Sequence, residues 1–155
     1  MNKIFVATTG WQAIIDKNSE YYKFATKYFC KLRDKEIPII TSNFVMDETL
    51  TWVNEQIGHN EAVKVMELWQ EAEDSNLMEV FVIDKKIEQE AREIFKRYSD
   101  YQLSFTDATT FALCRKYEIK KIFGFDRDFN TIGFLLNPYR VHEEEADYKV
   151  LAPDV

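Results

Sequence analysis

Glycine, proline and cysteine are all scarce in this chain, with four, three and two residues among 155. So few glycines and prolines argue against long flexible linkers, and the length suits one domain. No apolar run approaches the roughly 20 residues needed to cross a bilayer, and the apolar stretch at 1–6 is too short for a secretion signal. We therefore expect one cytoplasmic domain with no membrane span.

The scarcity of cysteine and histidine limits the sites that the chain can build. Cys30 and Cys114 each sit in an apolar helical pattern, so we expect two buried thiols rather than a disulfide or a metal site. His59 and His142 stand apart from each other and from the other candidate residues, and we expect both at the surface.

Positive charge is also in short supply, because 27 acidic residues outnumber 20 Lys and Arg and the formal net charge is −7. This balance argues against non-specific duplex binding, which requires basic residues to neutralise phosphates. It does not exclude a nucleic-acid enzyme, since acids gathered in a pocket become compatible with phosphates once cations are bound. Apolar residues make up 46% of the chain, enough for one core.

Strand and helix signals alternate along the sequence. Strands are expected at 3–6, 37–41, 78–83, 120–125 and 133–136, with helices between them. The expected helix N-caps are Thr9, in a capping box with Gln12, then Ser42 or Asn43, Asn60, Asp84 and Ser104. The alternation predicts an α/β sandwich around a mostly parallel sheet. Pro138 is expected to end a domain spanning 1–138, with 139–155 as a solvated tail or, alternatively, a partner contact.

The ends of the first and fourth expected strands mark the place to look for a site. In open parallel sheets, ligands bind beyond the carboxyl ends of the strands. The first strand runs into Ala7, Thr8 and Thr9. The fourth runs into Asp126, Arg127 and Asp128, and both ends should open onto the same edge of the domain.

Glu48 is unexpected where it stands, four residues after Phe44 and four before Trp52 on one helical stripe. An acid on an apolar stripe is costly unless it meets a partner or a cation. The alternative is a Glu at the edge of the stripe, with its carboxylate in water. Asp47 falls on another face of the helix and is expected to be solvated.

Asp107 and the Asp126–Asp128 pair each have two interpretations. Asp107 shares a helical face with Phe111, and it also completes a Ser-x-x-Asp capping box that begins at Ser104. The cap and the ligand roles are compatible. Asp126 and Asp128 are either ligands or ordinary turn and cap residues.

Taken together, the four carboxylates predict a metal site. Clustered acids raise one another's pKa values, so they rarely assemble without a function. Oxygen ligands without His or Cys suit Mg²⁺ or Mn²⁺ rather than Zn²⁺. The members are Glu48, Asp107, Asp126 and Asp128.

Four segments then resemble the PIN-domain family in order and spacing, over most of the chain. The segment 3–13 looks like a PIN-domain opening, and 41–51 is similar to the stretch that bears the second acid, which selects Glu48. The segment 98–108 resembles the third, with Asp107. Finally, 125–134 resembles the fourth, with Asp126 and Asp128.

The resemblance implies a three-layer α/β/α PIN fold, a Mg²⁺ or Mn²⁺ cofactor and hydrolysis of RNA phosphodiester bonds. In VapC-like members it also implies a toxin, a cognate antitoxin that blocks the site, and a homodimer. The implied ligands are Glu48, Asp107 and Asp126, with Asp128 supporting them. Hydroxyls of Thr8 and Thr106 either position ligands or waters or make local helix-start hydrogen bonds.

Ala7 departs from the family pattern, which places Asp at this position. Alanine can neither ligate a cation nor orient water, so we expect the chain to have little nuclease activity and weakened metal binding. An engineered substitution and a natural loss both account for it. Because the other matched acids are intact, we favour the engineered substitution.

Two other functions fit the sequence less closely. A non-catalytic PIN-like module that binds RNA or protein is favoured if Ala7 is natural. A receiver-like phosphotransfer domain needs a Lys at a later strand end, whereas Lys120 and Lys121 precede their strand's core.

The basic residues that could contact RNA are 85–86, 96–97, 115–116 and Arg127. The alternative interpretation of each is a solvated surface residue. Arg127, closest to the acids, is the best candidate for substrate binding.

Overall fold

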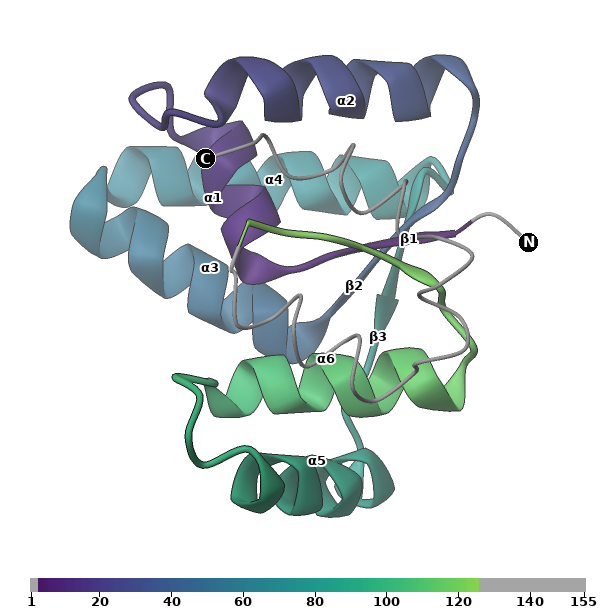
Figure 1. The fold of residues 1–155 in the computed structure, drawn as a ribbon. Helices are drawn as coiled ribbons and strands as arrows, with labels where there is room; N and C mark the ends of the chain where they lie inside the picture. The colour runs from purple at the N-terminus through teal and green to yellow at the C-terminus, as the bar shows by residue number, and fades with distance from the viewer. Residues whose placement is uncertain (1–2, 126–155) are drawn as a thin grey trace.

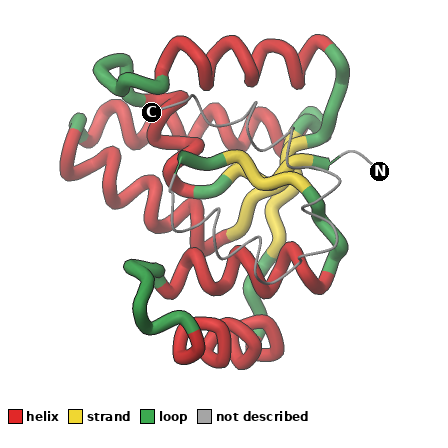
Figure 2. The backbone as a smooth tube through the Cα atoms, viewed as in Figure 1, coloured by secondary structure: helices red, strands yellow, loops and turns green. Residues whose placement is uncertain are grey.

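The computed structural model describes residues 3–125, and these contain a four-stranded sheet in the order β3-β2-β1-β4 with every neighbouring pair parallel (Figures 1 and 2). The sequence prediction of a mostly parallel α/β fold is confirmed. The expected strand at 133–136, the tail at 139–155 and His142 lie outside the described residues. The strands are β1 Ile4–Val6, β2 Ile39–Ser42, β3 Met78–Phe81 and β4 Lys121–Phe123.

Each pair of successive strands is joined by two helices, as parallel pairing requires a long crossover. Helices lie on both sides of the sheet, giving three layers (Figure 1). They are α1 Thr8–Ile15, α2 Tyr22–Asp34, α3 Asn43–Gln56, α4 His59–Asp74, α5 Lys85–Arg97 and α6 Phe105–Lys116. Among the described residues, no helix is long and apolar enough to cross a membrane.

Trp11 of α1 holds the first helical layer together. Its ring centroid lies 5.6 Å from that of Phe29 in α2 and 5.3 Å from that of Trp69 in α4. Its indole N–H donates to the Thr41 hydroxyl at 3.3 Å, and that hydroxyl donates to the Val6 carbonyl at 3.3 Å. These buried polar groups therefore satisfy one another between α1, β1 and β2.

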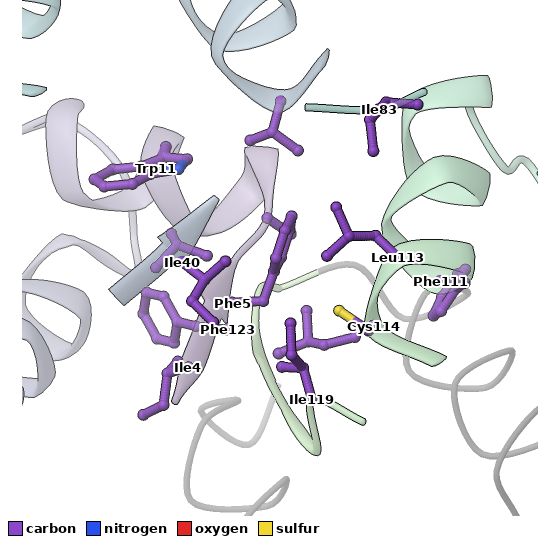
Figure 3. Packing of buried hydrophobic residues seen from close by; sticks show 14 of the residues in the cluster. Ile4, Phe5, Trp11, Ile40, Ile83, Phe111, Leu113, Cys114, Ile119 and Phe123 are labelled. Carbon is purple, nitrogen blue, oxygen red and sulfur yellow. The ribbon is translucent and has the colours of Figure 1, made fainter. Parts of the chain in front are cut away.

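The second layer, α5 and α6, covers the opposite face of the sheet. Leu113 and Cys114 of α6 point toward Phe5 of β1 (Figure 3). Cys114 is buried as expected, and burial raises the pKa of its thiol, which keeps it protonated and unreactive. Side chains from β1 and α6 thus pack in one core.

Three local predictions are wrong. Cys30 is exposed, because it sits one residue beyond Phe29 and is turned by about 100° from the buried stripe of α2. Helix α4 begins at His59 with Gly58 as its N-cap, so Asn60 lies inside the helix. Helix α1 begins at Thr8 after Ala7, so Thr9 is not the N-cap.

The other predicted caps are confirmed. The side chains of Ser42, Asp84 and Ser104 accept hydrogen bonds from the backbone N–H groups of Val45, Ile87 and Asp107. Each cap fixes the first turn of a helix that follows a strand or loop directly. His59 is exposed, as expected.

Candidate metal centre

The strand order creates a switch point between β1 and β4. The chain passes from β1 to β2 to β3 in one direction and then places β4 on the other side of β1. The carboxyl ends of β1 and β4 are therefore neighbours, and ligands of open parallel sheets bind in the crevice beyond such strand ends. Ala7 directly follows β1, and Phe125 comes two residues after β4.

Ala7 lies at the centre of this edge and is buried, with 2% of its surface exposed. Its N–H donates to the Phe123 carbonyl at 3.0 Å. It occupies the N-cap position of α1 in extended backbone conformation, and it makes no side-chain cap. An acidic side chain here would thus start from the N-terminus of a helix, where the helix dipole favours negative charge.

Phe125 is fixed beside the same helix. Its N–H donates to the Thr9 hydroxyl at 3.0 Å. A Cβ on Gly124 would lie 3.0 Å from that hydroxyl and 3.5 Å from the Cβ of Ala7, so the backbone of 124–125 passes close to position 7. Asp126 is bonded to Phe125. Asp126, Arg127 and Asp128 themselves lie outside the described residues.

Glu48 comes from the second turn of α3, which begins immediately after β2. The start of α3 is held by the Ser42 cap and by Asn43, whose side-chain oxygen accepts from the Ile83 N–H at 2.9 Å. Glu48 is half-buried, whereas Asp47 is exposed. The expectation that Asp47 is solvated is therefore confirmed, and Glu48 is the more enclosed of the two acids.

Asp107 belongs to a complete capping box at the start of α6. Its N–H donates to the Ser104 hydroxyl at 3.0 Å, and its carboxylate accepts from the Ser104 N–H at 3.2 Å. The cap interpretation is thus confirmed. One carboxylate oxygen is held by the helix, which fixes the direction of the side chain.

The first turns of α3 and α6 lie together. Phe44, one turn before Glu48, meets Phe105 edge-to-face with ring centroids 6.4 Å apart, and Phe105 is two residues before Asp107. Figure 1 shows the start of α6 beside α3, on the side of the sheet where β1 runs into α1. The elements that carry Ala7, Glu48 and Asp107 therefore share one edge of the domain.

A metal ion at this edge would meet an oxygen-only donor set. Within 3–125 no three His, Cys, Asp or Glu residues are grouped closely enough to hold a metal, and in that range the predicted set supplies only Glu48 and Asp107. Thr8, next to Ala7, has a buried hydroxyl without a hydrogen-bond partner among the described residues. A buried hydroxyl normally has such a partner, so Thr8 fits a ligand or water in the crevice.

Sequence reasoning did not identify two hydroxyls in this region. Thr9 was assigned to a helix cap, but it binds the chain that leads into Asp126. Thr49, next to Glu48, is buried, and its hydroxyl likewise has no partner among residues 3–125. The signal for both is a Thr within two residues of a predicted site residue.

The candidate basic residues lie mainly on α5 and α6. Three of them take part in surface ion pairs: Lys96 with Glu93 at 3.6 Å, Arg115 with Glu90 at 3.7 Å and Lys116 with Asp84 at 3.9 Å. Lys85, Lys86 and Arg97 are exposed. The described candidates therefore fit their alternative interpretation as solvated residues.

Comparison with known proteins agrees with this fold. The family model for the PIN domain matches residues 6–135. The chain is 32% identical over 132 residues to the 23S rRNA-specific endonuclease VapC20 of Mycobacterium tuberculosis, in strains CDC 1551 and H37Rv, covering 85% of this chain and 95% of the relative. A crystal structure of M. tuberculosis VapC20, titled a sarcin-ricin loop cleaving toxin, matches with a TM-score of 0.73 and 33% identity. That match covers 84% of this chain and 95% of the solved one.

The parallel α/β/α domain and its match to endonuclease relatives place the chain among nucleases of the hydrolase class. The chain belongs to the PIN-domain family. Within that family it is a VapC-like ribonuclease, as the sequence resemblance implied.

Proposed function

We propose that this chain is the scaffold of a divalent-metal-dependent endoribonuclease toxin in which Ala7 stands where an active protein has Asp. The main support is the convergence of four segments at one sheet edge. Position 7, Glu48 and Asp107 come from elements that meet there, and the bond from Phe125 to Thr9 brings in the segment leading to Asp126.

The proposed ligands are Glu48, Asp107 and Asp126, with Asp128 supporting them. All are carboxylates, which suit Mg²⁺ or Mn²⁺. When bound, the ion supplies an activated water and stabilises the charge that develops on the phosphate. Ser104 orients Asp107 through the capping box. Half-buried Glu48 limits the water around the reacting phosphate, and Arg127 binds the RNA backbone.

Ala7 is proposed to inactivate the centre. Without a carboxylate at the start of α1, the metal loses one ligand and the crevice loses one negative charge. The surrounding structure is complete: Ala7 is buried, its N–H is bonded, and Thr8 beside it has a hydroxyl available to the crevice. Ala7 is therefore proposed to remove a metal ligand without disturbing the fold around it.

VapC20 is named as an endonuclease specific for 23S rRNA and as a toxin. By that likeness we propose a structured RNA substrate, a cognate antitoxin protein, a homodimer and cytoplasmic action for this chain. We also propose that the PIN domain spans 1–138, with 139–155 as a separate tail.

The test is restoration of the missing acid. Ala7→Asp should cleave total RNA in the presence of Mg²⁺ or Mn²⁺, and EDTA should abolish the cleavage. Ala7→Asn is the matched control, because Asn has nearly the same size as Asp but carries no charge. This variant should stay inert. A folded, metal-loaded Ala7→Asp protein that cuts no RNA would exclude the nuclease proposal.

Ala7 itself also supports a second candidate, a PIN-like module that binds RNA or protein without cutting. Sequencing the chromosomal codon for position 7 separates the two. An Asp codon favours the nuclease, whereas an Ala codon favours the binding module.

A further inference from the structure

A cavity lies one helical turn beyond the proposed metal ligand Glu48. It has a volume of about 580 Å³ and is lined by the end of α1, the loop that follows, the second half of α3 and the start of α4. Trp52 of α3 forms part of its wall, and Ile15 and Ile57 are the other apolar residues there. The nuclease chemistry proposed above does not use this cavity.

Trp52 connects the cavity to the metal centre. Residues four apart on a helix share a face, so Glu48 and Trp52 lie on the same stripe of α3, about 6 Å apart along its axis. Trp52 is only half-buried, whereas Trp11 and Trp69 are buried, with 5% and 3% of their surface exposed. A strand of RNA whose phosphate sits at Glu48 can therefore reach Trp52 with an adjacent nucleotide.

The polar lining suits an uncharged ring better than a phosphate. Asn18 and Gln56 offer amide groups that both donate and accept hydrogen bonds. Asp16, Lys17 and Glu61 also line the cavity, and the two carboxylates outnumber the one ammonium group, so the lining disfavours an anion. Each carboxylate has a partner: Asp16 accepts from the Asn18 N–H at 2.9 Å, and Glu61 pairs with Lys64 at 3.1 Å.

Stacking on an aromatic side chain and hydrogen bonding by amides is how proteins bind single-stranded bases. We propose that this cavity is a nucleobase pocket, in which Trp52 stacks on an unpaired base next to the scissile phosphate and Asn18 and Gln56 contact the base edge. The proposal rests on the ribonuclease function for its substrate, but binding in the pocket requires neither Ala7→Asp nor a metal.

The first experiment uses the chain with Ala7 in EDTA, so that no cleavage occurs. Labelled short oligoadenosine and oligouridine RNAs are titrated against the parent and against Trp52→Ala, Trp52→Phe and Gln56→Ala. We expect Trp52→Ala to weaken binding of at least one RNA about fivefold or more, and Trp52→Phe to retain most of the affinity. Tyr117→Ala, which removes an exposed aromatic ring outside the pocket, is the matched control and should leave binding unchanged.

A second experiment removes the base instead of the protein side chain. Oligonucleotides carrying one abasic position are scanned against the parent and Trp52→Ala. At one position, loss of the base should weaken binding to the parent but not to Trp52→Ala, because the two changes remove the same contact. This result is independent of any loss of stability in the variant, which a thermal melt measures separately.

Two results would overturn the pocket. One is equal RNA affinity of the parent and a folded Trp52→Ala protein. The other is quenching of tryptophan fluorescence by an arginine-rich peptide but not by RNA, seen in the parent and absent in Trp52→Phe, which would make the cavity a protein contact. Base-dependent binding together with an inert Ala7→Asp protein would support the nucleobase pocket and contradict the nuclease function. Cleavage by Ala7→Asp without any effect of Trp52→Ala on binding would support the nuclease function and contradict the pocket.

Discussion

The hydroxyl of Thr9 accepts a hydrogen bond from the backbone N–H of Phe125 at 3.0 Å, across 116 positions of sequence. This bond joins the first turn of α1 to the chain that leaves β4. It holds the backbone of Phe125, the residue before Asp126, beside the helix that follows position 7. We therefore expect the spacing of the proposed metal ligands to depend on a residue that is not itself an acid.

Thr9→Val should separate the two segments. It removes the acceptor and leaves the Phe125 N–H without its partner, so we expect a loss of about 1–2 kcal/mol in the free energy of unfolding. In the Ala7→Asp background, RNA cleavage should fall by more than this loss of folded protein explains. Thr9→Ser keeps the hydroxyl and should retain activity. Equal activity of the valine and serine variants would show that the bond does not position the site.

Gly10→Ala should destabilise the protein, contrary to helix propensity. In an exposed helix this change gains about 1 kcal/mol. Here a Cβ on Gly10 would lie 2.5 Å from the Phe123 carbonyl oxygen, which belongs to the backbone of β4 and cannot move easily. We expect a loss of about 2 kcal/mol or more, measured by urea unfolding. A stability equal to the parent's would mean that α1 and β4 can move apart freely.

Asp107→Asn should separate the two roles of this residue. The amide oxygen can still accept from the Ser104 N–H, so we expect the stability to change by less than about 1 kcal/mol. In the Ala7→Asp background, however, cleavage should fall at least 100-fold, because a neutral amide is a poor ligand for Mg²⁺. Ser104→Ala tests the cap alone, and it should cost about 1 kcal/mol while retaining some cleavage. Full activity of Asp107→Asn would remove Asp107 from the ligand set.

Thr8→Val removes the buried hydroxyl beside Ala7 with little change in shape. Since this hydroxyl has no partner among residues 3–125, the stability of the metal-free protein should stay the same or rise by about 1 kcal/mol. In the Ala7→Asp background the variant should need a higher Mg²⁺ concentration for half-maximal cleavage. A clear drop in the stability of the metal-free variant would mean that the hydroxyl is already satisfied.

Asp84 should give part of the stability a dependence on pH. The Ile87 N–H, which the carboxylate caps, lowers the pKa of Asp84 below its ordinary value of 3.8, and Lys116 lowers it further. A lowered pKa in the folded state stabilises the protein above about pH 4, and this contribution disappears as the pH falls through the folded-state pKa. Asp84→Asn keeps the cap but does not titrate. Urea unfolding between pH 7 and pH 2.5 should show a steeper loss for the parent, and parallel curves would contradict the assignment.

The parts of the structure that sequence predicted well depend on local interactions. Ser42, Asp84 and Ser104 were recognisable as caps because each bonds to a group three residues away. The position of Ala7 at the end of β1, beside the end of β4, followed from a general property of parallel sheets, whereas the convergence of Glu48 and Asp107 with it stays a prediction.

The parts that sequence missed depend on distant partners. Thr9 and Gln12 have the spacing of a capping box, yet the partner of the Thr9 hydroxyl is Phe125, which no local pattern identifies. Cys30 is exposed because only one stripe of α2 is buried, and apolar neighbours alone do not define its limits. Trp52 could be placed on the stripe of Glu48, but the cavity beside it needs the loop after α1, whose path the sequence does not specify.

The pairing of β1 with β4 bears on how the protein is made. Ile4, Phe5 and Val6 pair with residues 121–123, so the first strand has one of its two neighbours only after most of the chain has been synthesised. A nascent chain from which residues 121–123 have not yet emerged therefore cannot pair β1 with β4, whichever residue occupies position 7. In the proposed nuclease, the edge that carries position 7 is thus incomplete until the fourth strand leaves the ribosome.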